Sequence, residues 1–446
     1  MRPLRHLILP LSLAAVASAL PGVASLSGLP VLATATADPP HLASLERPLP
    51  RDVAFRQWTT GPTTGLTDAT DDLGDRGTFT RTEVRGGALK IGTNAAGDRA
   101  LTGRWTSPWV RPGFSLTELV PSWEAATPGA SSIEVEVRAR STDGVSSWDT
   151  ISVWAKGDEH VRRSSGASQS DDLGRVLYDT WLAPGASAWQ VRVALKRPGV
   201  DAVSPRVETV GAMVSRLPSV QRVATSLAGS HRGEALGAVL PVPRYSQMVH
   251  KGSYRQYGGG GEAWCSPTAT AMVLAYYDAL PPESSYSWVR AGHPDPEVAQ
   301  VARATYDTSY GGTGTWPFNT AYAASRTGSA FVTRLRNLRE VERFVNVGIP
   351  LVASIRFGAG ELRGAPISSS NGHLLVIAGF TRAGDVVVND PAADSRAGVR
   401  RVYDRTQFET AWLRRDSSGT GGSGGIVYVV HDEEHPLPDN MVQSNW

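Results

Sequence analysis

The sequence predicts a two-domain protein, with an N-terminal all-β sandwich of the jelly-roll-like kind and a C-terminal α+β domain. Its 446 residues exceed the size of one ordinary domain, and its hydrophobic residues, at 41%, are numerous enough to fill two cores. The first half alternates apolar and polar residues with a period of two, which is typical of strands. In the second half a helical pattern precedes several apolar runs, which indicates an α+β domain.

Composition excludes several classes of protein. Lysine and arginine (44) nearly balance aspartate and glutamate (42), leaving a net charge of +2. Proteins that bind nucleic acid concentrate basic residues on one face, so we expect no nucleic-acid partner. The single cysteine, Cys265, rules out intrachain disulfides and multi-thiolate metal sites. The aspartate-rich segments 71–75 and 171–174 match no complete calcium loop, so we expect neither a metal nor a cofactor.

The N-terminus has the parts of a secretory signal peptide, which we expect to span residues 1–37. Arg2 and Arg5 give a positive start, Leu7 to Leu20 is an apolar run, and Ala35-Thr36-Ala37 forms a cleavage site. A retained membrane anchor is the alternative, because no charge appears between Leu7 and Ala37. Three prolines interrupt that stretch, whereas spanning a bilayer takes about 20 consecutive apolar residues. We therefore expect a secreted, extracellular protein with no stable membrane insertion after cleavage.

Residues 45–215 form the predicted sandwich. Ile133, Val135, Val137 and Ala139 alternate with charged residues, and the segment from Trp189 to Leu195 has a similar pattern. Such alternation marks strands with one buried and one solvent-facing side. Eight of the 13 tryptophans lie in this region. We expect most of them to fill the core, while any exposed ones would suit the binding of cell-wall carbohydrate.

The periodicity fades over residues 216–239, which we interpret as a linker between two domains that act independently. The C-terminal domain is expected over residues 240–439. Ala269, Met272, Val273 and Tyr276 fall at helical spacing. Strands are expected at residues 349–357, 373–380, 386–388 and 426–430, the last after a flexible glycine-rich loop at 419–425.

Cys265 is the first candidate catalytic residue. Pro267 suits the first turn of a helix, because the N–H that it lacks has no partner there. Cys265 would then lie at a helix N-terminus, where the helix dipole and free N–H groups stabilise a thiolate, the nucleophilic form of the side chain. A buried, inert cysteine is the alternative, but it fits poorly with an exported protein that keeps one unpaired thiol.

His373 is the candidate base, since it begins an apolar strand, and Asp390 follows the next strand seventeen residues later. A hairpin turn on Arg382-Ala383 places Asp390 diagonal to His373 on the same face. A turn on Ala383-Gly384 instead moves it out of reach. A carboxylate at this place would fix the imidazole tautomer and stabilise its cation. The other acidic candidates nearby are Asp385, Asp394 and Asp404.

Residues 242–430 resemble the papain-like superfamily, and most of all the bacteriocin-processing-type cysteine peptidases (cysteine peptidase family thirty-nine and its relatives), here of a secreted actinobacterial type. In that family a Gln precedes a Cys that opens a helix, a His begins a strand, and an Asp-Pro ends the next strand. Gln247, Cys265, His373 and Asp390-Pro391 match this pattern. The resemblance implies a papain-like fold, a Cys265–His373–Asp390 triad and Gln247 as the side-chain donor of the oxyanion hole.

The chain departs from the family pattern at two places. Ser266-Pro267 follows the cysteine where the family usually has Gly, which bears on the substrate cleft. Gln247 lies 18 positions before Cys265, a larger separation than usual, and four glycines fall between them. Gln256 is closer in sequence, but it adjoins those glycines. An oxyanion donor has to be preorganised, so we expect Gln247 to serve.

These observations predict a secreted cysteine peptidase that acts on a peptide or protein substrate. Cys265 would attack the carbonyl, His373 would accept and return the proton, and Asp390 would orient His373. A cell-wall peptide amidase or an acyltransferase with the same triad is one alternative. A non-catalytic wall-binding protein with a decayed peptidase domain is another, although the presence of all triad residues argues against decay.

Overall fold

The computed structural model describes residues 51–61, 69–92, 101–166, 172–218, 223–228, 235–415, 422–440 and 444–446. The predicted signal peptide and residues 419–421 of the predicted glycine-rich loop lie outside this part of the chain. Within it, no helix is long and apolar enough to cross a membrane.

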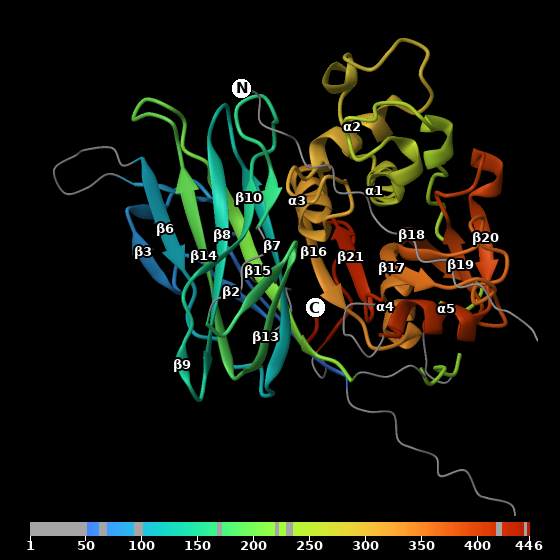
Figure 1. Cartoon of the computed structure of the whole chain (residues 1–446), viewed down its shortest axis with the longest axis horizontal. Helices are drawn as coiled ribbons and strands as arrows, with labels where there is room; N and C mark the ends of the chain where they lie inside the picture. Colours follow the sequence, from blue (N-terminus) through green and yellow to red (C-terminus); the bar gives the residue numbers. More distant parts are fainter. Residues whose placement is uncertain are drawn as a thin grey trace, which may run out of the picture. The chain divides into compact units, whose positions relative to one another are not determined.

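The N-terminal domain consists of two facing sheets (Figure 1). Their strands pair antiparallel, apart from the parallel pair of β1 with β2. The first sheet has the order β12 (Arg175–Leu177), β13 (Thr180–Ala186), β7 (Leu116–Ala126), β15 (Arg206–Arg216), β1 (Asp52–Thr59) and β2 (Thr70–Asp72), with β5 (Leu89–Ile91) on β15 and β4 (Thr82–Val84) on β5. The second has the order β11 (Ser164–Ser165), β10 (Asp149–Trp154), β8 (Ser132–Ser141), β14 (Ala188–Lys196), β6 (Thr102–Thr106) and β3 (Thr78–Thr80), with β9 (Gly144–Val145) on β8.

The core between these sheets confirms the predicted alternation. On β8, the side chains from Ile133 to Ala139 that face inward are fully buried, while Glu136 on the outer face pairs with Arg192 of β14 at 2.5 Å. Trp58 of the first sheet packs edge-to-face against Trp105 and Trp189 of the second, with ring centroids 5.4 and 6.0 Å apart. Six of the eight tryptophans predicted to fill this core are buried: Trp58, Trp105, Trp123, Trp154, Trp181 and Trp189.

The C-terminal region is α+β, as predicted. Its antiparallel sheet has the order β16 (Ser329–Arg334), β21 (Ile426–His431), β17 (Leu351–Phe357), β18 (Ser370–Phe380), β19 (Val386–Asn389) and β20 (Arg400–Tyr403). The helices are α1 (Cys265–Tyr276), α2 (Pro296–Thr305), α3 (Trp316–Thr327), α4 (Leu338–Asn346) and α5 (Arg405–Leu413), with short 3-10 turns η1 (Gln247–His250), η2 (Gly261–Ala263), η3 (Glu283–Tyr286) and η4 (Arg396–Gly398). Helix α1 packs against β17 and β18, which brings its first residue beside the start of β18.

The two domains share a buried interface. Helix α3 and strand β16 pack on β7, and Phe318 of α3 contacts both Trp123 and Trp154, at centroid distances of 6.2 and 5.4 Å. The Val332 N–H of β16 donates to Ser122 Oγ of β7 at 2.9 Å. Separating the two domains would expose this apolar surface to water, which argues against the expectation that they act independently.

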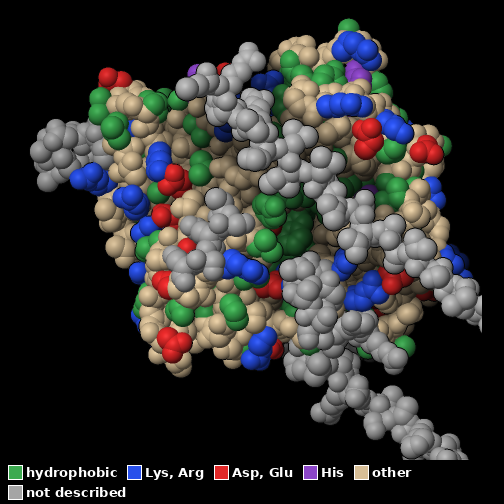
Figure 2. Space-filling model, in the orientation of Figure 1, with side chains coloured by type: hydrophobic (Ala, Val, Ile, Leu, Met, Phe, Trp, Pro, Cys, Tyr) green, Lys and Arg blue, Asp and Glu red, His purple; other side chains and the backbone are tan. Residues whose placement is uncertain are grey.

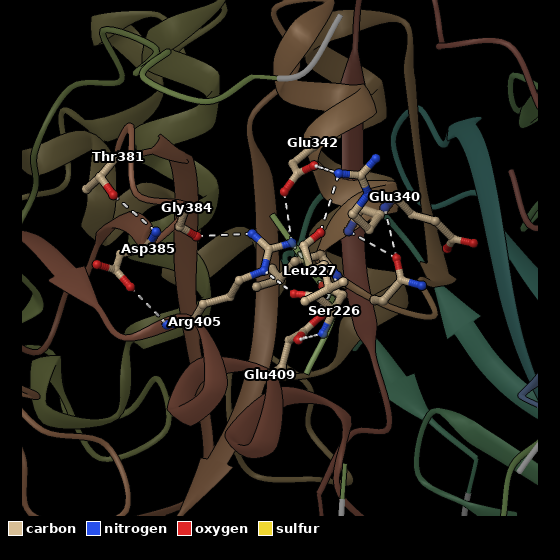
Figure 3. A network of polar contacts seen from close by, with 12 residues as sticks. Ser226, Leu227, Glu340, Glu342, Thr381, Gly384, Asp385, Arg405 and Glu409 are labelled. Atoms are coloured by element: carbon tan, nitrogen blue, oxygen red, sulfur yellow. Dashed lines mark hydrogen bonds and ion pairs between the residues drawn. The ribbon is translucent and has the colours of Figure 1, made fainter. Parts of the chain in front are cut away.

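Residues 223–228, in the predicted linker, are fixed to the C-terminal domain by the polar network of Figure 3. The Ser226 N–H and hydroxyl donate to the Glu409 carboxylate at 2.7 and 2.6 Å. Arg405 donates to the Ser226 carbonyl at 2.7 Å and to the Gly384 carbonyl at 3.0 Å, and pairs with Glu342 at 2.8 Å. The network ties this segment to α4, α5 and the β18–β19 turn.

Candidate active site

Cys265 is the first residue of α1, as the sequence predicts. The first hydrogen bond around the turn runs from the Thr268 N–H to the Trp264 carbonyl, at 3.0 Å. The N–H groups of Cys265 and Ser266 therefore have no acceptor within the helix, and Pro267 has no N–H to leave unpaired. The thiol accordingly lies at the positive end of the helix dipole, beside free donors.

His373 of β18 contacts Asp390 directly, with Nε2 and Oδ1 2.8 Å apart. The hairpin reaches this geometry by a route that the sequence does not reveal. Its turn closes through the Thr381 N–H and the Asp385 carbonyl at 2.9 Å, which leaves three residues in the loop. An irregularity in the pairing between Ile377 and Gly379 then shifts the register by one. That shift brings Asn389 opposite Val376, so Asp390 lies diagonal to His373.

Two further donors hold the Asp390 carboxylate, which is fully buried. The Tyr403 hydroxyl donates to Oδ2 at 2.7 Å and the Ala392 N–H to Oδ1 at 3.0 Å. Tyr403 comes from β20 and was missed by the sequence analysis, because nothing local marks a tyrosine on a short strand as a partner of this aspartate. The competing acidic residues have other roles or none: Asp385 accepts from the Arg405 N–H, Asp404 caps α5, and Asp394 is exposed.

The electrostatics of the three side chains favour charge separation. Burial alone would raise the pKa of the Cys265 thiol, but a hydrogen bond to His373, its charge, and the N–H groups of Leu374 and Ser266 together hold it below its ordinary value. Burial opposes protonation of His373, yet the neighbouring Asp390 and Cys265 raise the imidazole pKa above its usual range. Burial likewise opposes ionisation of Asp390, and the contacts with His373, Tyr403 and Ala392 nevertheless lower its pKa. These contacts therefore favour the thiolate form of Cys265 and the imidazolium form of His373.

Gln247 lies next to this group, in η1, and is buried. Its backbone N–H donates to the Pro391 carbonyl at 2.9 Å, and its side-chain Nε2 donates to the Glu262 carbonyl at 2.8 Å. A carbonyl can only accept, so this contact fixes the amide orientation and leaves the second Nε2 hydrogen uncommitted. The close approach of η1 and η2 requires glycine at Gly261, where a Cβ would lie 2.5 Å from the Gln247 carbonyl oxygen.

A cleft of about 790 Å³ opens over these residues. Gln247, Cys265 and His373 line it, whereas Gln256 is exposed elsewhere. Asp390 lies behind His373 and does not line the cleft. The structure thus brings Cys265, His373, Asp390 and Gln247 together. Among the described residues, no group of three or more His, Cys, Asp or Glu side chains could hold a metal ion.

Cys265 is expected to react with iodoacetamide well below about pH 8, faster than a free thiol with a pKa near 8.5. The physical reason is the lowered pKa of its thiol. The rate is measured by intact mass over a pH series of the folded protein, and one cysteine makes the assignment unambiguous. Labelling that appears only after unfolding would show a buried, unreactive thiol.

Two family models match the chain. Residues 54–215 match the model described as Peptidase C39 N-terminal domain, and residues 239–420 match the model described as Peptidase_C39 like family. No curated protein matches the chain. The two matches cover the sandwich and the α+β region in turn, and they confirm the resemblance drawn from the sequence.

Proposed function

Because the chain belongs to the C39-like cysteine peptidases and carries their actinobacterial N-terminal domain, we propose that it hydrolyses peptide bonds with Cys265 as nucleophile. The observation that carries this proposal is the contact chain from Cys265 through His373 to Asp390. A helix with a cysteine at its start, packed on an antiparallel sheet that supplies the histidine and the aspartate, also supports a papain-like arrangement. We also propose that the sandwich is of the jelly-roll-like class and that the protein is extracellular after cleavage behind Ala37.

In the proposed reaction, His373 moves the proton at each step. The Cys265 thiolate attacks the peptide carbonyl, and the imidazolium of His373 gives its proton to the departing amine. Nε2 of His373 is held by Asp390, so the ring nitrogen available to the thiol and the leaving group is Nδ1. Neutral His373 then takes a proton from water, which attacks the thioester and releases the acid and the free thiolate. Asp390 keeps its charge throughout and fixes the ring.

Negative charge on the carbonyl oxygen needs donors that are already in place. The free Cys265 N–H at the start of α1 is one, and the uncommitted Nε2 hydrogen of Gln247 is the other. Glu262 supports this role, because its carbonyl orients the Gln247 amide before substrate binds.

Gln247→Ala is therefore expected to lower turnover by about 10²–10³, the usual loss for one oxyanion donor. The rate of Cys265 alkylation should hardly change, since the thiolate does not depend on this amide. Both rates are measured on the same preparation, with Gln256→Ala as the matched control at wild-type activity. The reverse ranking of the two glutamines would move the oxyanion donor to Gln256.

The function is tested by incubating the secreted chain with an unstructured peptide library and with cell-wall peptides, and by identifying the products by mass spectrometry. Cleavage by the wild type and none by Cys265→Ala supports a peptidase. Cleavage confined to wall peptides would favour the wall amidase, and products joined to an added amine would favour the acyltransferase. Absence of turnover together with retention on wall material would favour the binding protein.

Binding of cell-wall material by the sandwich would rest on Trp109 and Trp148, the two of its eight tryptophans that are not fully buried. Arg140 lies over the Trp109 ring at 4.3 Å, and Arg192 over the Trp148 ring at 4.1 Å. Arg138 contacts both rings. A sugar would have to displace these guanidinium groups, so the peptidase remains the function that the site supports best.

Figure 2 shows acidic and basic side chains interspersed on the visible face, without one large basic patch.

A further inference from the structure

The turn that joins β12 to β13 in the sandwich reaches the active-site cleft. Its two residues, Tyr178 and Asp179, line the same cleft as Cys265 and His373. Tyr178 has a φ of +53°, a left-handed conformation that a bulky residue rarely adopts. Backbone strain of this kind is retained where the surroundings impose it, often at ligand-binding positions.

The C-terminal domain holds this turn in place. The Tyr178 ring packs edge-to-face against Tyr310 at a centroid distance of 5.1 Å. One carboxylate oxygen of Asp179 accepts from the Trp316 N–H at 2.8 Å. The loop before Trp316 is fixed in turn by Asp307, which accepts from the Thr315 hydroxyl at 2.7 Å and from the Ser165 N–H of the sandwich at 3.0 Å. We call the cleft wall made by Tyr178, Asp179, Tyr310, Thr315 and Trp316 the Asp179 wall.

The Asp179 carboxylate accepts from the first N–H of α3 and forms no ion pair with a side chain in the described part of the chain. No lysine or arginine in the described part of the chain pairs with Asp179, whose contacts are the Trp316 N–H and the Thr180 hydroxyl. Burial raises the pKa of Asp179 to about 6, and the nearby Asp307 adds to that rise. Arg356, the one lysine or arginine among the described residues that line the cleft, lies close enough to Glu361 to lower the pKa of that carboxyl.

A carboxylate beside aromatic rings is a suitable environment for a cation. The carboxylate supplies a charge-assisted hydrogen bond, and the faces of tyrosine and tryptophan attract positive groups. A positively charged group of a bound peptide would therefore gain binding free energy at this wall, from the carboxylate and the ring faces, that a neutral group would not gain.

We propose that the Tyr178–Asp179 turn is a substrate-binding element of the peptidase site, and that Asp179 selects peptides with a positively charged side chain near the scissile bond. The inference rests on the proposed function, because it concerns the substrate of the same site. It makes the N-terminal domain a part of the enzyme, since the sandwich contributes Tyr178 and Asp179 to the cleft wall.

The test uses the full secreted chain and pairs of peptides that differ only by lysine or norleucine, scanned over the positions on both sides of the cleaved bond. The wild type should prefer lysine at one position by roughly 10–100-fold in kcat/KM, the range expected for a hydrogen bond to a charged group. Asp179→Asn keeps an oxygen that can accept from the Trp316 N–H, so the wall stays in place. It should lower kcat/KM for the lysine peptide to about that for the norleucine peptide, and so abolish the preference.

Asp143→Asn, in an exposed turn of the same domain, is the matched control and should keep the wild-type preference. A preference that survives in Asp179→Asn, or a wild type with none, would overturn the inference while hydrolysis itself still stands. Equal losses on both peptides would assign Asp179 a purely structural role and overturn it as well. If no peptide is cleaved by the wild type, the proposed function fails and this inference fails with it.

Discussion

Peptide hydrolysis by His373→Ala is expected to fall on the order of 10⁴–10⁶-fold, as it does when one member of a catalytic triad is removed. In the proposed mechanism the imidazole both stabilises the Cys265 thiolate and carries the proton to the leaving amine, so its loss would remove two effects at once. The pKa of Cys265 should rise, because hydrogen bonding to His373 and its charge oppose the effect of burial. Turnover and the pH profile of alkylation are measured together.

Three further variants separate this effect from general damage to the protein. His160→Ala removes an exposed histidine and should leave both measurements unchanged. Asp390→Asn keeps the shape of the side chain but replaces a buried acceptor of three hydrogen bonds, and should lower turnover by up to about 10⁴. Asp394→Asn, four residues away and exposed, should have no effect. Wild-type turnover in His373→Ala would contradict the proposed mechanism.

Glu118→Gln is expected to lower the free energy of unfolding by about 3–5 kcal/mol, the usual cost of leaving a buried charge unpaired. Glu118 of β7 lies in the domain interface between Arg334 of β16, at 2.5 Å, and Arg415, which follows α5. All three residues are buried. Burial lowers the pKa of Arg334 to about 10, whereas the negative charge of Glu118 acts to raise it. Glutamine at position 118 would remove the charge that offsets the cost of burying the guanidinium.

The measurement is urea unfolding of the full chain, compared with Glu134→Gln. Glu134 pairs with Lys196 on the partly exposed outer face of the second sheet, where one ion pair contributes about 0–1 kcal/mol. A loss in Glu118→Gln no larger than in Glu134→Gln would show that the interface does not depend on this cluster.

The sequence predicts the elements whose signals are local. The alternation from Ile133 to Ala139 is that of β8, and the spacing from Ala269 to Tyr276 is that of α1. Cys265 could be identified because it stands at the start of a helix, and His373 because it begins an apolar strand. Helix α3 was missed for a physical reason: every residue from Pro317 to Ala324 is buried, so no polar face marks a helical period.

The remaining features depend on contacts between distant residues. The irregularity near Ala378 that sets the His373–Asp390 register is a property of the paired strands, and a count of loop residues does not reveal it. Tyr403 supports Asp390 from a separate strand. Tyr178 and Asp179 lie more than eighty residues before Cys265 and belong to another domain. Their place in the cleft follows only from the packing of the two domains.

The central claim is that Cys265 forms a covalent acyl intermediate during hydrolysis. The most direct measurement is the intact mass of the full chain, quenched in acid during turnover of a peptide that it cleaves. We expect a mass increase equal to the acyl part of that peptide, located on Cys265 after digestion and missing in Cys265→Ala. Hydrolysis that persists in Cys265→Ala, or turnover during which the protein stays unmodified at every quench time, would contradict the account.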